Sequence, residues 1–490
     1  MGRRTGFALA GVVLVAGVLR WVVGVRGGLW LDEAWSVLIA RGCDGDWLAV
    51  WGEANRVDNN HPLVSMWMVA VGAWREDWVY RAGVWGVTLM VPWLAWGVGN
   101  CVATDSRGEE RTERGHVWPV VAWAAVCFAL TVYGTEARGY GVVVGASLAA
   151  WWLVVAGRGL WGCVGYWAVC AVGVAAHFSF VQVLGGLVLW QVMCGGRRWG
   201  RVALWQGVPI GVAVGVFAGF VVRVKVAGAG GLGEGQAVWA VWGEAGLGML
   251  SMLAGGPWEG TGAWVLGGAI AVATGWVSWL RRREGGWVVI GAWAVAGAMV
   301  VGKAVVMGRG EVVFPRYFLV AGVASMVMLL VELGRVVGGR ENLEIRSPKK
   351  GERLGSPKRG RILALALLSV VLGANVWQTW RFATGGGRGE YLAPLQVAGS
   401  SGEPTLGSDY DSRALRMENF NRHRLPDRID YRRLSDGAWP ATPPRWYLAG
   451  TGVRAAGTTR IQVGGARYVL RERYRQYGPS GWAWLLYERE

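Results

Sequence analysis

The chain has 490 residues, of which 53% are hydrophobic, and its formal net charge is +17. Its mean hydropathy of +0.31 is too high for an ordinary soluble protein, and its apolar residues come in long blocks. The composition therefore excludes a soluble nucleic-acid-binding protein as the explanation of the positive charge. It predicts a membrane protein instead.

A membrane-spanning helix needs about 20 predominantly apolar residues. The blocks of that size run near 7–25, 82–101, 117–132, 139–157, 160–176, 178–194, 202–222, 261–280, 286–306, 317–334 and 362–380. We therefore predict about eleven spans in an all-α polytopic membrane protein. We interpret the first block as a retained helix, not a cleaved signal peptide, because it is long and leads directly into an acidic motif.

Clusters of basic residues predict the orientation of these spans. They lie at Arg3–Arg4, Arg107–Arg114, Arg197–Arg201, Arg281–Arg283 and Arg335–Arg361. With eleven spans, every cluster falls on the side of the N-terminus, which the positive-inside rule assigns to the cytoplasm. We expect a multi-pass protein of the cell inner (cytoplasmic) membrane, with a cytoplasmic N-terminus and an external or periplasmic C-terminal domain.

The first external loop, 26–81, carries the motif LWLDEAW at positions 29–35. A charge at membrane level is costly, so Asp32 and Glu33 form a candidate functional site. The alternative is that both acids are solvated loop residues that cap a following helix. A second apolar stretch, 61–74, is short for a span, and we expect a helix that lies along the outer interface.

The sequence predicts four regions. They are a transmembrane catalytic core at 1–334, a basic cytoplasmic linker loop at 335–361, the last transmembrane helix at 362–380 and an external domain at 381–490. The linker mixes Lys, Arg, Ser, Pro and Gly without periodicity, as disordered segments do. Short strand-like runs at 445–449, 467–470 and 483–488 predict that the last region is a small α/β domain.

The cysteines show no metal-ligand spacing, and most lie in or beside apolar spans, so we interpret them as packing residues. They are Cys43, Cys101, Cys127, Cys163, Cys170 and Cys194.

Polar residues that could carry chemistry gather at the outer ends of the predicted spans, whereas the middles of the spans hold almost no charge. They are Asp32, Glu33, Asp58, Asn59, Asn60 and His61 in the first loop, Glu136, Arg138 and Tyr140 in YGTEARGY, His177 in HFSF, Lys303, and Arg316 and Tyr317 in FPRYF. This pattern favours an active site at the outer membrane surface over an ion or proton path through the bilayer.

The residue types suggest attack on a group linked to a lipid phosphate. A carboxylate such as Asp32 takes the proton from an incoming hydroxyl. Fixed cations such as Arg138 and Arg316 hold the leaving phosphate. The alternative is that both arginines are snorkelling anchors, that His61 only starts a helix and that His177 is a hydrogen-bonded interface histidine.

Five motifs in order carry a resemblance to a known class of enzymes. They are LWLDEAW, NNHPL at 59–63, TEARGY at 135–140, HFSF at 177–180 and PRYFLV at 315–320. The chain resembles, over roughly 1–335, the polyprenyl-phosphate-sugar-dependent membrane glycosyltransferases of the GT-C class. That superfamily includes protein O-mannosyltransferases and lipid A aminoarabinose transferases.

The resemblance implies a multi-span helical core, interfacial helices in the first external loop and inverting transfer of a sugar from a polyprenyl phosphate to an acceptor. It assigns Asp32 to the catalytic or acceptor-positioning carboxylate and Glu33 to its supporting neighbour. By the same resemblance Arg138 and Arg316 lie near the lipid phosphate, and we group Lys303 with them. We assign the remaining polar positions to substrate binding: His61, Asn60, Glu136, Tyr140, His177 and Tyr317.

The expected partners are a polyprenyl-phosphate-linked sugar donor, an acceptor glycan, lipid or protein, and membrane lipid, without nucleic acid. Some relatives use a divalent metal, which Asp32, Glu33 and His61 would supply ligands for. These residues lack a tight ligand signature, so a metal stays open, and we expect no other cofactor. Two alternative functions are a lipid-linked glycan flippase or carrier, and an oligosaccharide polymerase or ligase. The early Asp–Glu pair favours the single-sugar transferase.

Overall fold

The computed structural model describes most of the chain, and all structural statements below concern the described residues. These are 3–25, 29, 31–51, 61–72, 77–103, 117–157, 159–194, 199–226, 238–307, 314–338, 357–389, 391–435, 437–439, 442–451, 458–479 and 483–490. The chain divides into two compact units. Unit 1 contains Met1–Arg20, Arg56–Val64 and Val84–Thr379, and unit 2 contains Trp21–Asn55, Ser65–Gly83 and Trp380–Glu490.

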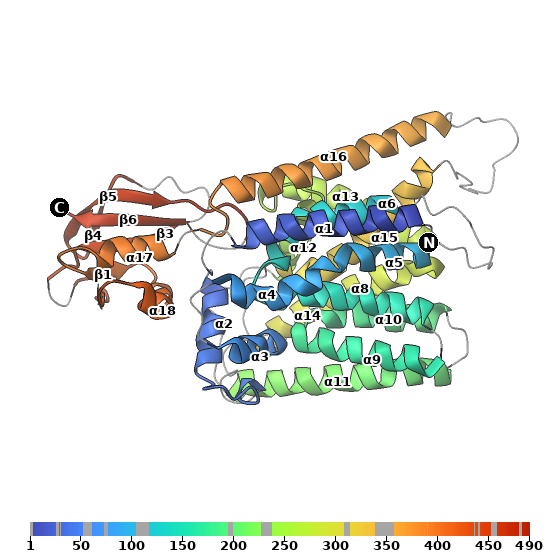
Figure 1. The fold of residues 1–490 in the computed structure, drawn as a ribbon, viewed down its shortest axis with the longest axis horizontal. Helices are drawn as coiled ribbons and strands as arrows, with labels where there is room; N and C mark the ends of the chain where they lie inside the picture. Colours follow the sequence, from blue (N-terminus) through green and yellow to red (C-terminus); the bar gives the residue numbers. More distant parts are fainter. Residues whose placement is uncertain are drawn as a thin grey trace, which may run out of the picture. The chain divides into compact units, whose positions relative to one another are not determined.

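Unit 1 is a bundle of helices that lie side by side (Figure 1). The helices up to the end of the bundle are α1 (Arg3–Val25), α2 (Leu31–Arg41), α3 (Pro62–Val71), α4 (Asp77–Leu89), α5 (Val91–Ala103), α6 (Trp118–Val126), α7 (Phe128–Gly134), α8 (Tyr140–Ala156), α9 (Gly159–Ala176), α10 (Phe180–Cys194), α11 (Trp199–Val226), α12 (Val238–Leu253), α13 (Gly260–Leu280), α14 (Trp287–Met307), α15 (Leu319–Val337) and α16 (Pro357–Thr384). Each of the eleven predicted spans coincides with a helix or a pair of helices, so the predicted polytopic helical fold is confirmed. Helix α2, most of α3 and the first part of α4 belong to unit 2.

Six described segments are long and apolar enough to cross a membrane. They are Asp77–Ala103, Gly159–Ala176, Gly260–Leu280, Arg282–Gly302, Pro315–Val337 and Lys358–Thr384. Exposed apolar side chains on α13 and α16, such as Val272, Trp276 and Val370, fit a surface that faces lipid. Within the apolar stretch 61–74, residues Pro62–Val71 form the short helix α3, which is 10 residues long.

Helix α12 was missed by the sequence analysis. It has only 16 residues and contains Glu244 and three glycines, which weaken its apolar signal. The glycines serve packing, because a Cβ atom on Gly248 would lie 2.5 Å from the carbonyl oxygen of Trp258. The adjacent residues 227–237 lie outside the described residues.

Helix α15 lies at the centre of the bundle, in contact with α5, α6, α8, α10, α12, α13 and α14. With 19 residues it is about 28 Å long. A one-turn 3-10 helix, η5 (Pro315–Phe318), precedes it. Its other end carries Arg335, which pairs with Glu284 at 2.6 Å and Glu332 at 2.9 Å. Arg316 therefore lies just before this buried helix, and the ion-pair network of Arg335 lies near its other end.

The break between α6 and α7 is held by a side chain from a distant helix. At Cys127 the backbone leaves helical geometry, with φ −59° and ψ 119°. The N–H of Phe128 donates to Oδ1 of Asn375 at 2.7 Å, and Nδ2 of Asn375 donates to the carbonyl of Leu253 at 3.2 Å. Asn375 is fully buried, and its amide ties the N–H at the break to the end of α12.

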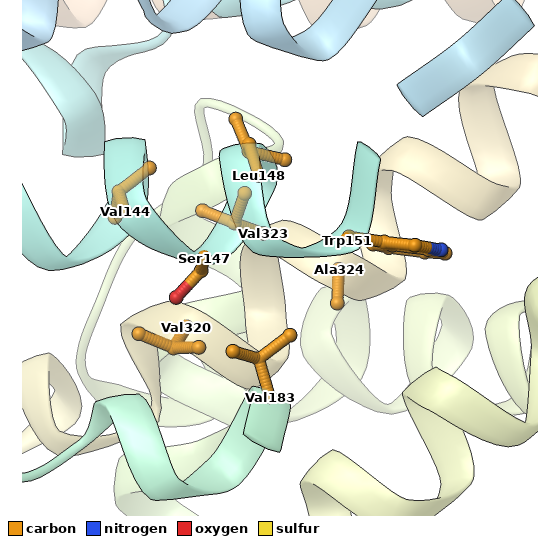
Figure 2. A pocket seen from close by; sticks show the side chains of 8 residues that line it. All are labelled: Val144, Ser147, Leu148, Trp151, Val183, Val320, Val323 and Ala324. Atoms are coloured by element: carbon orange, nitrogen blue, oxygen red, sulfur yellow. The ribbon is translucent and has the colours of Figure 1, made fainter. Parts of the chain in front are cut away.

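A small cavity lies among α8, α10 and α15 (Figure 2). It is lined by Val144, Ser147, Leu148, Trp151, Val183, Val320, Val323 and Ala324. Its volume of about 10 Å³ suits a single water molecule and excludes a lipid or a sugar. Figure 2 shows the Ser147 hydroxyl directed toward Val320.

The C-terminal part of unit 2 is an α/β domain, as predicted. Its mixed sheet has the order β2-β1-β3-β6-β5-β4. The strands are β1 (Thr405–Ser408), β2 (Asp430–Tyr431), β3 (Trp446–Thr451), β4 (Arg460–Val463), β5 (Ala466–Tyr474) and β6 (Ala483–Arg489), and the helices are α17 (Leu392–Gly399), α18 (Asp411–Asn421) and the 3-10 turn η6 (Arg422–Arg424). Strand β1 is parallel to β2 and β3, whereas β3, β6, β5 and β4 pair antiparallel.

The turn and the core of this domain follow from the sequence. Gly464 and Gly465 have φ of 55° and 83°, as a two-residue hairpin turn between β4 and β5 requires. The core is formed by buried, mostly aromatic residues of the central strands together with Trp439. These buried residues are Trp439, Tyr447, Tyr468, Leu485 and Tyr487.

Candidate functional site

Four segments of unit 1 bring polar side chains together at the end of the bundle where α15 begins. His61 comes just before α3, Arg138 and Tyr140 come from the turn between α7 and α8, His177 comes from the α9–α10 turn, and Arg316 comes from η5. We call these five residues the His–Arg cluster. All five are at least nine-tenths buried.

The three rings of the His–Arg cluster contact one another. The ring centroids of His61 and His177 lie 4.6 Å apart, and those of Tyr140 and His177 also lie 4.6 Å apart. The guanidinium carbon of Arg138 lies 5.4 Å from the centre of the Tyr140 ring. Arg316 lies over Phe314, 4.3 Å from the ring centre. Both guanidinium groups are thus held by aromatic faces.

The glycine in the motif TEARGY is required by this close packing. A Cβ atom at Gly139 would lie 1.8 Å from the carbonyl oxygen of Ala176 and 2.9 Å from Nδ1 of His61. No side chain fits there without displacing the backbone of the α9 end. Gly139 therefore allows three of the four segments to meet.

Backbone groups contact Nδ1 of both histidines. Nδ1 of His177 accepts the N–H of Ser179 at 3.0 Å, and Nδ1 of His61 accepts the N–H of Gly139 at 3.0 Å. An imidazole nitrogen that accepts a hydrogen bond carries no proton, so the proton of the neutral His177 ring sits on Nε2. Nδ1 of His61 also lies 3.4 Å from the carbonyl oxygen of Ala176. Within the described part of the chain, Nε2 of His177 and the hydroxyl of Tyr140 have no hydrogen-bond partner.

Burial and charge keep both imidazoles neutral. Burial lowers the pKa of His61 and of His177 well below the usual range, and the positive charge of Arg138 lowers both further. Among the described residues, Arg138 and Arg316 each carry a positive charge beside these neutral rings, and Glu136 is fully buried in the same turn. The buried guanidinium groups, together with Nε2 of His177 and the hydroxyl of Tyr140, favour an anionic ligand with several acceptor oxygens.

The segment that carries Arg316 is positioned by Gln182 of α10, a residue that the sequence analysis did not identify. Nε2 of Gln182 donates to the carbonyl of Tyr317 at 2.6 Å, and its Oε1 accepts the N–H of Ala321 at 3.2 Å. Gln182 is one of two glutamines, with Gln191, in an otherwise apolar helix, and a polar residue inside an apolar span was the available signal. It fixes η5 and the first turn of α15 on α10.

Unit 2 holds the acidic motif. Asp32 and Glu33 lie in the first turn of α2, where acidic residues stabilise the helix dipole. Arg81 of α4 donates through Nε to Oε1 of Glu33 at 2.9 Å and through Nη2 to Oε2 at 2.7 Å. The side chains of Arg81 and Glu33 are 4% and 0% exposed, so this is a buried, two-pronged ion pair. Asp32 is partly exposed.

The remaining predicted site residues are placed as follows. Tyr317 lies in η5 and is partly buried. Lys303 belongs to α14, four residues before its end, but its side chain is outside the description. Asp58, Asn59 and Asn60 lie outside the described residues.

The residues considered for a metal do not fit one as they are arranged. Both carboxylate oxygens of Glu33 are bound by Arg81, and Nδ1 of His61 is bound by a backbone N–H. Among the described residues, no group of three or more His, Cys, Asp or Glu side chains gathers as metal ligands would. All six cysteines are free thiols.

No protein-family model matches the chain, and no curated protein matches it. Among solved structures, the chain is similar to the crystal structure of ArnT from Cupriavidus metallidurans bound to undecaprenyl phosphate. The two chains are 13% identical, the match covers 99% of this chain and 98% of that chain, and the TM-score is 0.47.

Proposed function

We propose that the protein is a membrane glycosyltransferase that moves a sugar from a polyprenyl-phosphate donor to an acceptor on the outer side of the cytoplasmic membrane. In this proposal residues 1–334 are the catalytic core, and the His–Arg cluster binds the donor phosphate. The observation that carries the proposal is the composition of this cluster. Two buried guanidinium groups and the donors of His177 and Tyr140 stand at the end of a bundle of apolar helices.

A polyprenyl phosphate matches both parts of this arrangement. Its chain partitions into the bilayer beside the helices, and its phosphate carries the charge and the acceptor oxygens that the cluster favours. Arg138 and Arg316 would hold the phosphate, and Nε2–H of His177 would donate to one of its oxygens. Lys303 is a further candidate for the same phosphate, and His61, Asn60, Glu136, Tyr140 and Tyr317 are candidates for the sugar and the acceptor.

The proposed reaction is an inverting displacement. The carboxylate of Asp32 accepts the proton of an acceptor hydroxyl while that oxygen attacks the anomeric carbon of the sugar. The bond from the anomeric carbon to the phosphate oxygen breaks, and its electron pair stays on that oxygen. The arginines stabilise the growing charge. Of the two adjacent acids, Glu33 is bound by Arg81, whereas Asp32 is partly exposed and matches the catalytic carboxylate of the motif, so Asp32 is the candidate base.

Incubation of the purified protein with a panel of labelled polyprenyl-phosphate sugars and acceptors tests this assignment. We expect Asp32→Asn to slow transfer by about 10²–10⁴-fold, the usual contribution of a general base. Asp44→Asn is the matched control, because Asp44 is exposed and its φ of 47° is one that asparagine tolerates. Near wild-type turnover in Asp32→Asn would show that Asp32 is not the base.

A further inference from the structure

The helix that carries Asp32 is too short to be stable without support. Helix α2 has 11 residues, and isolated helices of fewer than about 12 residues are marginal in water. Its position therefore depends on contacts with other segments, and the contacts that follow lie within unit 2.

One end of α2 is held by the first turns of α4. The N–H of Leu29 donates to Oδ2 of Asp77 at 3.1 Å, and Glu33 is bound by Arg81. Leu29 and Glu33 are four residues apart, and so are Asp77 and Arg81. The two contacts thus repeat at the period of one helical turn and lie on either side of Asp32 in the sequence.

The same Asp77 is bound by the C-terminal domain. Nη2 of Arg424, in η6, donates to Oδ1 of Asp77 at 2.7 Å. The two side chains are 17% and 12% exposed, so the ion pair is largely shielded from water. The two oxygens of Asp77 thus connect η6 to the residue that leads into α2.

The other end of α2 also contacts the C-terminal domain. The guanidinium carbon of Arg41, the last residue of α2, lies 5.2 Å from the ring centre of Phe420, and that of Arg424 lies 5.6 Å from it. Phe420 is 1% exposed and belongs to α18, which packs against α2. The Phe420 ring is therefore contacted by two cations, Arg41 from α2 and Arg424 from η6.

We infer that the C-terminal domain sets the position of the Asp32 helix, with Phe420 and Arg424 as positioning residues. The inference rests on the proposed function for its kinetic consequence only. A carboxylate displaced by about 1 Å loses on the order of 10²-fold in rate. The donor phosphate is assigned to unit 1, so its affinity should not change.

The test compares full-length wild type with Arg424→Gln and Phe420→Leu, using Arg428→Gln as the matched control because Arg428 is an exposed arginine of the same segment. Hydrogen exchange of residues 31–41 needs no substrate and is the first readout. We expect the amides of α2 to exchange faster than in wild type in both variants. In the control their exchange rate should be unchanged. Unchanged exchange would overturn the inference whether or not a sugar donor is found.

The second readout separates positioning from loss of folding. We expect kcat to fall about 10–100-fold in Arg424→Gln, with donor affinity unchanged and partial recovery in Arg424→Lys. Asp77→Asn combined with Arg424→Gln should lose no more than the worse single variant, because both remove one contact. Equal losses in kcat and donor affinity would contradict a positioning role. A wild type that transfers no sugar would reject the proposed function, while exchange of α2 would still decide the docking.

Discussion

The buried ion pair between Glu33 and Arg81 allows a quantitative prediction that separates structural from catalytic acids. Glu33→Gln leaves the guanidinium of Arg81 in a site that is 4% exposed, without an opposite charge. Removing one partner of a buried pair costs about 3–5 kcal/mol of folding free energy. We expect the same loss in Arg81→Gln, since either change leaves one buried charge uncompensated.

Replacing both residues should restore most of that loss. Glu33→Met combined with Arg81→Met removes both charges, and such replacements are often neutral or stabilising by about 1–4 kcal/mol. The control is Arg432→Gln, which breaks the pair with Asp430, whose side chain is 63% exposed. Exposed pairs contribute about 0–1 kcal/mol.

Denaturant unfolding in detergent, followed by tryptophan fluorescence, measures these differences. We expect a large loss of folding free energy in both single glutamine variants and recovery in the double methionine variant. The control should change little. Per folded molecule, Glu33→Gln should keep more transfer activity than Asp32→Asn. Single variants no less stable than the surface control would refute the assignment of Glu33 to a structural role.

Further predictions concern the His–Arg cluster and the orientation of the chain. Arg138→Ala and Arg316→Ala should weaken donor binding, and lysine at either site should rescue only partly, because it loses the two-pronged geometry; full activity with lysine would favour simple anchoring. Gly139→Ala should lower the unfolding midpoint strongly, whereas Gly268→Ala, with open space at its Cβ, should not. Because burial lowers the pKa of His177, the unfolded state binds more protons, so stability should fall as pH drops below about 6.5, and His177→Gln should flatten that slope in unfolding measurements. Cysteine labelling from each side of intact cells should place the C-terminus opposite the basic linker; finding both on one side would overturn the eleven-span topology.

The sequence predicted the spans and the His–Arg cluster because both leave local signals. An apolar block of sufficient length is visible by itself, and a charge at the end of such a block stands out against it. The predicted strand-like runs correspond to β3, β5 and β6, whereas β1, β2 and β4 have only 4, 2 and 4 residues. Strands so short give no recognisable pattern.

The residues that position the site could not be predicted because they act through contacts between distant segments. Arg81 is 48 residues from Glu33, Gln182 is 135 residues from Tyr317 and Asn375 is 247 residues from Phe128. Each is a polar residue in or beside an apolar stretch, and the pairing follows only from the tertiary structure. Helix α12 was missed for a different reason, since its length and glycine content give it a weak signal.

The stoichiometry of donor cleavage tests directly whether the protein transfers a sugar from a polyprenyl phosphate. Phosphorus NMR of the purified protein in vesicles, with donor and acceptor present, measures free polyprenyl phosphate beside the labelled glycosylated acceptor. We expect one polyprenyl phosphate to be released for each sugar transferred, and we expect this release to be strongly reduced in Asp32→Asn. Movement of intact donor between the leaflets without any cleavage would contradict it and would favour a carrier.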